Sequence, residues 1–543
     1  MKLRNILTIG FAGVALSIMA QTHKEGVEYF KADQFDNAKT LLERNMDKPG
    51  TDKAVSHYYL GRIAMLEEKY DEAAKHFELG AQANPDYGYN YVGLGALQLK
   101  QGDAQLAAKD FKQAESCDKK DAELQIDIAR AYYDANPELY AKEIAKRIQN
   151  ATKKDKENPS IYIFEGDRYA DQKDWGHAGT QYEMAVGYDP NATGAYVKYA
   201  NLFRMVNPQY SIDMLKKLLE VNPQSALGQR ELANAYYNTE NYAEAAKQYG
   251  NYVNNPNHFK EDEDRYALLL FSDGKYQQGY DYATKLLQSN PGNFTAQRFQ
   301  FMNAAQIPAM ADQMLPLAES LYAAHKANPA KNKFAPIDYN LIADELQRNK
   351  RPDEAITVIE EAIQTMPDNA NFNKVLASIY VDLNNLPGAA DAYAGYIAKT
   401  KKPDYNDYIQ QALYDYFAGA QTIKDDPAKS NEYFAKATEN ANKASEAAPN
   451  QYKPKKVLGD VAIAQAPKEE IAKVAFPMYS EAIVLLEGSK DPSRYTSDAK
   501  AIYNYLGNYW LDQKDTAKAK EYFNKYLTLD PNNEQYRKFV ESL

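Results

Sequence analysis

Residues 57–85 read HYYLGRIAMLEEKYDEAAKHFELGAQANP, which is two helix-like segments with a short polar turn between them and a proline at the end. Gly61 lies in the first segment, where a small residue lets two helices cross closely. Ala73 and Phe77, twelve and sixteen residues later, lie on one face of the second segment. Pro85 ends that segment, because a proline disfavours helix in the residue before it. The stretch therefore predicts a helix-turn-helix unit.

This unit recurs along the chain at a nearly constant interval. Gly61 is followed 34 residues later by Gly95 and after another 34 by Ala129. The same small position returns at Gly166, Ala200, Ala233, Ala267, Ala343, Ala377 and Gly507. An alanine follows many of these sites by twelve residues, at Ala73, Ala107, Ala178, Ala245, Ala355, Ala389 and Ala519. The series indicates a repeat array, since 543 residues are too many for one compact core.

The pattern resembles the tetratricopeptide repeat. The residues that carry the resemblance are Leu60, Gly61, Tyr70, Ala73, Phe77 and Pro85, and later Leu506, Gly507, Ala519, Phe523, Tyr526 and Pro531. The resemblance implies an all-α fold, a superhelical α-solenoid of about thirteen helix-turn-helix repeats. It also implies that the first helix of each pair lines the concave side.

The first twenty residues differ from the rest of the chain. Lys2 and Arg4 give a basic start, residues 6–18 are almost all apolar or small, and Ala20 precedes Gln21. This order is typical of a secretory signal peptide. We therefore expect residues 1–20 to be removed and the chain to be an exported bacterial type of tetratricopeptide repeat protein.

The repeat pattern weakens between residues 292 and 336. Prolines interrupt the period there, at Pro308, Pro316 and Pro329. We therefore expect an N-terminal array over residues 21–291, a degenerate repeat or joint over 292–336, and a C-terminal array over 337–543.

Composition disfavours several classes of function. The formal net charge is −11, which does not favour binding to nucleic acid. The six histidines and the single cysteine are scattered, with no metal-ligand spacing, no glycine-rich phosphate loop and no nucleophile elbow. We therefore expect no catalytic residues, no metal and no cofactor, and a protein that is not an enzyme.

The concave side offers the candidate binding residues. Counting from the small site of each first helix gives Tyr58, Arg62, Asp167, Arg230, Asn234, Tyr237, Asn340, Asp344, Asn504 and Asn508. This mixture of rings, amides and charges suits polar recognition of an extended peptide, a loop or a glycan.

These observations lead to one function and one alternative. We expect a non-enzymatic scaffold that is periplasmic or bound to the outer membrane as a peripheral protein, and that holds an outer-membrane or periplasmic protein partner. The alternative is a protein that binds glycan or cell-wall polymer, because tyrosine rings can stack on sugars and the chain has 45 tyrosines.

Overall fold

The computed structural model describes residues 22–543, and in that part of the chain every regular element is a helix. The predicted signal peptide at residues 1–20 lies outside the described residues. The chain divides into two compact units, residues 1–285 and 286–543. Among the described helices, none combines the length and the apolar character that crossing a membrane requires.

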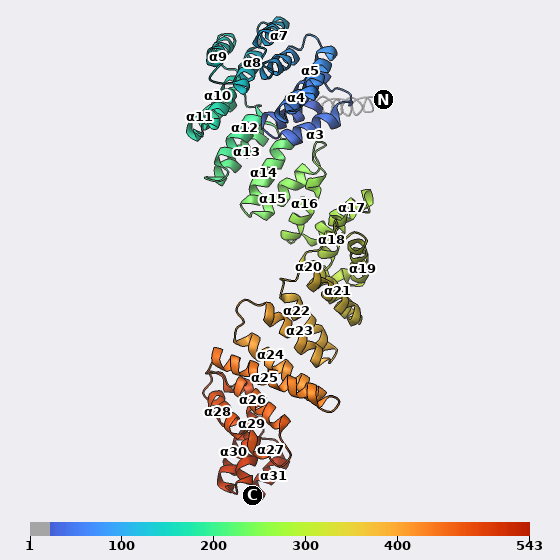
Figure 1. Cartoon of the computed structure of the whole chain (residues 1–543), viewed down its shortest axis with the longest axis vertical. Coiled ribbons are helices and arrows are strands. Elements are labelled where there is room, and N and C mark those ends of the chain that lie inside the picture. The colour runs from blue at the N-terminus through green and yellow to red at the C-terminus, as the bar shows by residue number, and fades with distance from the viewer. Residues whose placement is uncertain (1–21) are drawn as a thin grey trace, which may run out of the picture. The chain divides into compact units, whose positions relative to one another are not determined.

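The helices of the first unit pair in chain order (Figure 1). The pairs are α2 (Thr22–Lys31) with α3 (Phe35–Asn45), α4 (Lys53–Leu66) with α5 (Tyr70–Ala83), α6 (Tyr89–Lys100) with α7 (Ala104–Cys117), α8 (Ala122–Ala135) with α9 (Ala141–Lys154), α10 (Pro159–Asp171) with α11 (Trp175–Tyr188), α12 (Thr193–Phe203) with α13 (Pro208–Val221), and α14 (Ala226–Asn238) with α15 (Tyr242–Tyr252). They are followed by α16 (Glu261–Ser272) and α17 (Tyr276–Ser289). The division between the two units, after Lys285, falls inside α17.

The second unit continues the same arrangement. Its elements are α18 (Phe294–Ala304), the short 3-10 helix η1 (Pro308–Met310), α19 (Ala311–Ala327), α20 (Pro336–Arg348), α21 (Pro352–Thr365), α22 (Asn371–Asp382), α23 (Leu386–Lys399), α24 (Tyr405–Thr422), α25 (Pro427–Ala447), α26 (Lys453–Gln465), α27 (Ile471–Val474), α28 (Phe476–Glu487), η2 (Pro492–Tyr495), α29 (Thr496–Asp512), α30 (Thr516–Leu529) and α31 (Glu534–Ser542). The stretch 292–336 thus contains the pair α18 and α19, and Pro316 lies inside α19.

The pair α4 and α5 shows why this sequence folds as it does. Asp52 caps α4 by accepting the backbone N–H groups of Ala54 and Val55. Glu68, with φ +60°, turns the chain between the two helices. Gly61 lies against the buried Phe77, and a Cβ at this position would overlap the Phe77 ring. The absence of a side chain at Gly61 therefore sets how closely the helices approach.

The described part of the chain is thus an all-α solenoid of stacked helix pairs, as the sequence predicts. Left-handed turn residues recur between the two helices of many pairs, at Asp33, Glu68, Lys173, Glu240, Lys350, Asn384 and Lys514. Each pair therefore enters its second helix through a similar turn.

Candidate functional site

The first helix pair of the first unit contacts repeats that are far away in sequence. Besides α3 and α4, α2 packs against α12 and α14. At the end of α3, Arg44 Nη1 donates to the backbone oxygen of His258 at 3.0 Å, across 214 residues of chain. Tyr29 of α2 meets the ring of Phe259 edge-on at 5.4 Å. The first repeat therefore closes the first unit onto its later repeats.

Two carboxylates of α2 make this closure at the beginnings of other helices. Glu28 Oε2 accepts the backbone N–H of Gly194 in α12 at 3.0 Å. Glu25 Oε1 accepts the N–H of Leu227 in α14 at 2.7 Å and the hydroxyl of Ser225 at 3.4 Å. The first turn of a helix has unpaired N–H groups and a positive dipole end, which stabilise a nearby carboxylate. We call these bonds, with that of Arg44, the closing contacts.

Burial accompanies the closing contacts. Burial raises the pKa of Glu25 to about 7, although the N–H of Leu227 acts to lower it. Burial also raises the pKa of Glu28. Gly194 has no room for a side chain, because a Cβ there would stand 2.7 Å from the Cβ of Lys31.

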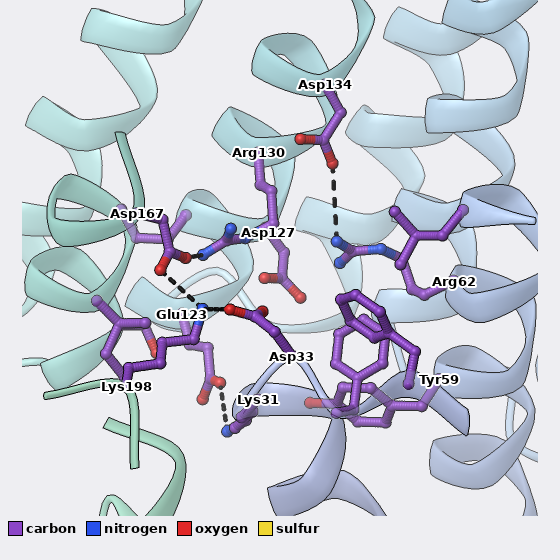
Figure 2. Close-up of a pocket in the computed structure, with 16 residues that line it drawn as sticks. Lys31, Asp33, Tyr59, Arg62, Glu123, Asp127, Arg130, Asp134, Asp167 and Lys198 are labelled. Carbon is purple, nitrogen blue, oxygen red and sulfur yellow. Dashed lines mark hydrogen bonds and ion pairs between the residues drawn. The ribbon is translucent and has the colours of Figure 1, made fainter. Parts of the chain in front are cut away.

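Beside α2 lies a cavity of about 160 Å³, which we call the charged cavity (Figure 2). Lys198 Nζ lies 2.7 Å from the carboxylates of both Asp33 and Asp167. Arg130 pairs with Asp167 at 2.8 Å, and Lys31 pairs with Glu123 at 3.1 Å. The four bases Lys31, Arg62, Arg130 and Lys198 thus face the five acids Asp33, Glu123, Asp127, Asp134 and Asp167.

The charges in this cavity neutralise one another. Although burial acts to raise it, the pKa of Asp167 is lowered by Lys198 and Arg130. Lys31 lowers the pKa of Glu123. Burial raises the pKa of Asp127, which accepts the Tyr58 hydroxyl at 2.5 Å. Because these groups are paired with one another, the cavity's main effect is to fasten the first repeat to α8, α10 and α12.

A larger cleft of about 800 Å³ lies on the other side of the turn between α2 and α3. That turn, residues 32–37, forms one wall, and helices α10 to α14 and α16 form the rest. Its acids are Asp33, Asp36 and Glu231, and its bases are Lys198, Arg204 and Arg265. We call it the α12–α14 cleft. It is wide enough for a chain segment, and its lining is balanced in charge.

Two of the predicted binding residues, Arg62 and Asp167, line the charged cavity. The Arg62 guanidinium lies over the Phe30 ring at 5.4 Å and donates to the Tyr58 hydroxyl at 3.0 Å. Asp167 is held by Lys198 and Arg130. Tyr58 is fully buried, so it cannot contact a partner in this structure. For Tyr58 the prediction of an accessible binding position is therefore corrected, because the rings of Phe77, Tyr87 and Tyr89 pack around it.

The other predicted residues of the first unit lie near α14. Arg230 pairs with the buried Asp262 at 2.7 Å. Asn234 lines the α12–α14 cleft and accepts from Arg265 at 3.1 Å. Arg265 also lies over the Tyr237 ring at 5.6 Å. Of these three predicted residues, only Asn234 lines the α12–α14 cleft.

The predicted residues of the second unit form two local sets. Asn340 and Asp344 lie on α20, and the Asp344 side chain is exposed. Asn504 and Asn508 are exposed on α29, where Asn504 accepts the Tyr536 hydroxyl at 2.9 Å. Whether any of these bind a partner stays a prediction.

Sequence reasoning missed the residues that close the first unit, namely Glu25, Glu28, Asp33 and Lys198. One signal was present. Lys198 is the one charged residue in the stretch 192–203, ATGAYVKYANLF, whose apolar character predicts a buried helix. A buried lysine needs a carboxylate partner, and its position pointed to a pairing that the repeat pattern does not contain.

In the described residues, no group of three or more His, Cys, Asp or Glu side chains is arranged to hold a metal ion.

Comparison with known proteins gives the following similarities. Tetratricopeptide repeat family models match residues 201–258, 346–411 and 501–533. A curated Dictyostelium discoideum protein, a DnaJ homolog subfamily C member 7 homolog, is 30% identical over 111 residues, which are 20% of this chain and 21% of that protein. The match thus spans about a fifth of that relative's length.

Two solved structures are also similar. The C-terminal part of a TPR repeat-containing protein from Cytophaga hutchinsonii has 19% identity and a TM-score of 0.40, covering 51% of this chain and 98% of that one. Yeast Tom70 has 15% identity and a TM-score of 0.27, covering 86% and 98%. The three family matches fall in both units and on helix pairs of the predicted period. This chain therefore contains tetratricopeptide repeats in both of its units.

Proposed function

We propose that this chain is a non-enzymatic scaffold of the bacterial envelope that holds a protein partner against its first unit. Tetratricopeptide repeats suggest a protein-interaction scaffold and generally have no catalytic role. The observation that carries the proposal is the α12–α14 cleft of about 800 Å³, with its mixture of amides, charges and apolar atoms. The signal-like first twenty residues support export to the envelope.

Site-specific photo-crosslinking in intact cells tests this function. A photo-reactive amino acid replaces Asn238, which lines the α12–α14 cleft, and a matched chain carries it at the exposed Asn508 of the second unit. We expect Asn238 to capture one predominant envelope protein, identified by mass spectrometry. Capture from Asn508 alone would move the binding site to the second unit. Crosslinks only to wall polymer, or none from either position, would contradict the scaffold.

Cell fractionation tests the location. We expect the chain in the periplasmic or outer-membrane fraction, and N-terminal sequencing of that form to begin at Gln21. Recovery in the cytoplasm with residues 1–20 retained would contradict the proposed location.

A further inference from the structure

The α12–α14 cleft continues into a neighbouring groove of the first unit. The groove has a volume of about 510 Å³ and shares Arg204, Ser211, Ala235 and Asn238 with the cleft. It adds Met205, Pro208 and Thr239 to the lining. The two form one channel from the turn between α2 and α3 to the turn between α12 and α13. We call it the amide channel.

The polar groups at one end of the amide channel are already paired. Gln34 Nε2 donates to Glu231 at 2.8 Å, and Asn37 Nδ2 donates to Gln34 at 3.0 Å. Lys198 is held by Asp33 and Asp167. This end belongs to the closure of the unit and offers little to a ligand.

The other end carries polar groups that are not paired. The side chains of Asn201, Arg204 and Asn238 are exposed, and none has a hydrogen bond or ion pair to another side chain in the described residues. Next to them, Met205 is 86% exposed and Val206 is 80% exposed. These are the two most exposed large apolar side chains of the described residues, and because they are adjacent they can pack together against a partner.

The chemistry of this end defines its ligand. An asparagine amide both donates and accepts, so Asn201 on α12 and Asn238 on α14 can pair with the backbone of an extended peptide. A guanidinium without a carboxylate partner binds a carboxylate through two parallel bonds. Methionine packs against apolar groups of varied shape. Arg204 is the charged residue that lines this groove, and the other lining residues there are uncharged, so this end is positive.

We propose that the amide channel binds an extended segment of the partner protein in which an acidic residue pairs with Arg204 and an adjacent apolar residue packs on Met205 and Val206. The proposal rests on the proposed function and specifies the partner's chemistry. The α2–α3 turn forms the far wall, so the segment enters from the side of α12 and α13.

A random peptide library displayed on phage, selected against the full chain, tests the proposal. We expect the selected peptides to share an acidic residue next to an apolar one. Their dissociation constants, measured by fluorescence anisotropy, should rise at least tenfold for Arg204→Glu and severalfold for Asn238→Ala. The control Arg494→Glu makes the same charge change at an exposed position of the second unit and should leave binding unchanged.

A charge swap makes the test specific. A selected peptide with lysine in place of its acidic residue should bind Arg204→Glu better than the unchanged chain. Selection of no peptide, of peptides without the acidic and apolar pair, or of peptides that bind Arg204→Glu as well as the unchanged chain would overturn the proposal. If Asn238 or Asn508 captures an envelope protein in cells despite such a result, the scaffold function stands and only the amide channel fails. If no partner is captured either, both fail.

Discussion

Arg44 in the first unit bonds to a residue 214 positions further along the chain, and Glu25 bonds to Leu227, 202 positions away. In the second unit, bonds between helix pairs are short in sequence. The Tyr452 hydroxyl, for example, reaches Asp498, 46 positions away. The helix contacts there join helices that are close in chain order. The same repeat thus builds a unit closed by its first helix and a unit held from each repeat to the next.

The difference bears on cooperativity. In an open array each repeat touches only its neighbours, so stability is close to a sum of local terms and damage stays local. A closed unit adds contacts between its first repeat and its later ones, so destabilising either one also destabilises the other. We therefore expect a destabilising substitution to weaken repeats across the whole first unit, but only the neighbouring repeats in the second unit.

The largest expected effect is that of removing the buried cation of the charged cavity. Lys198→Met leaves Asp33 and Asp167 without their shared partner, and the Lys198 side chain is only 8% exposed. Breaking a buried pair from one side costs about 3–5 kcal/mol, and we expect the low end of that range because Asp167 keeps its pair with Arg130 and Asp33 is partly exposed. The matched Lys455→Met breaks a more exposed pair with Glu481 in the second unit and should cost about 0–1 kcal/mol. Hydrogen exchange measured peptide by peptide gives the loss of stability in both variants. Equal losses in Lys198→Met and Lys455→Met would contradict the role of the charged cavity.

A pH series sharpens the comparison. The pKa of Glu25 is raised to about 7, so its closing contact is more stable when protonated, and that stability is lost as pH rises from about 4.5 to 7. The free energy of unfolding relative to Glu25→Gln should fall by up to about 3 kcal/mol over this window. Burial also raises the pKa of Asp415, in the second unit, to about 7. When the unchanged chain is compared with Asp415→Asn, stability should again fall as pH rises, but only hydrogen exchange near α24 and α25 should report it. If the difference in unfolding free energy between the unchanged chain and Glu25→Gln does not vary with pH, the closing role of Glu25 is contradicted.

Overpacking at the helix crossings should cost somewhat less. A Cβ at Gly61 would overlap Phe77, and one at Gly507 would overlap Phe523. Replacing either glycine with leucine should therefore cost about 1–3 kcal/mol. Urea unfolding gives the loss of unfolding free energy, and hydrogen exchange shows which helices are affected. We expect Gly61→Leu to loosen α12 and α14 as well as α4 and α5, and Gly507→Leu to loosen only the repeats beside α29. An unchanged urea midpoint for Gly61→Leu would refute the repeat register.

The smallest effect concerns single hydroxyl groups. Tyr58→Phe takes a donor from Asp127, a half-buried carboxyl whose pKa burial raises, and Tyr452→Phe takes one from Asp498, which is partly exposed. An unsatisfied buried acceptor costs about 1–3 kcal/mol, whereas an ordinary hydrogen bond contributes about 0.5–1.5 kcal/mol. Tyr58→Phe should therefore lower the stability of its unit more than Tyr452→Phe does. The reverse order in thermal unfolding would show that the charged cavity is open to water.

The sequence predicted what depends on neighbouring residues. Gly61, Ala73 and Phe77 gave the helix pair and its crossing, because their spacing follows from helix geometry. The closing contacts could not be predicted in this way. Whether Glu28 meets Gly194 depends on the small rotation between successive repeats, summed over several of them. The repeat pattern does not specify that sum.

A different reason limited the prediction of the site. Tyr58 has the spacing of a concave residue, but the rings of Phe77, Tyr87 and Tyr89, in its own and the next helix pair, bury it. The exposed Met205 and Val206 lie in a turn to which the repeat pattern assigns no role.

The bond between Arg44 and the His258 backbone also orders events in time. A protein is made from its N-terminus, so α2 and α3 emerge well before the residues that hold them. At about 5–20 residues per second, the intervening 214 residues take roughly 10 to 40 s to synthesise. Within that interval α8, α12 and α14 are made one after another, so Lys31 gains Glu123 first, Glu28 gains Gly194 next and Glu25 gains Leu227 last. Until then the nascent first repeat presents an unsatisfied, partly apolar surface.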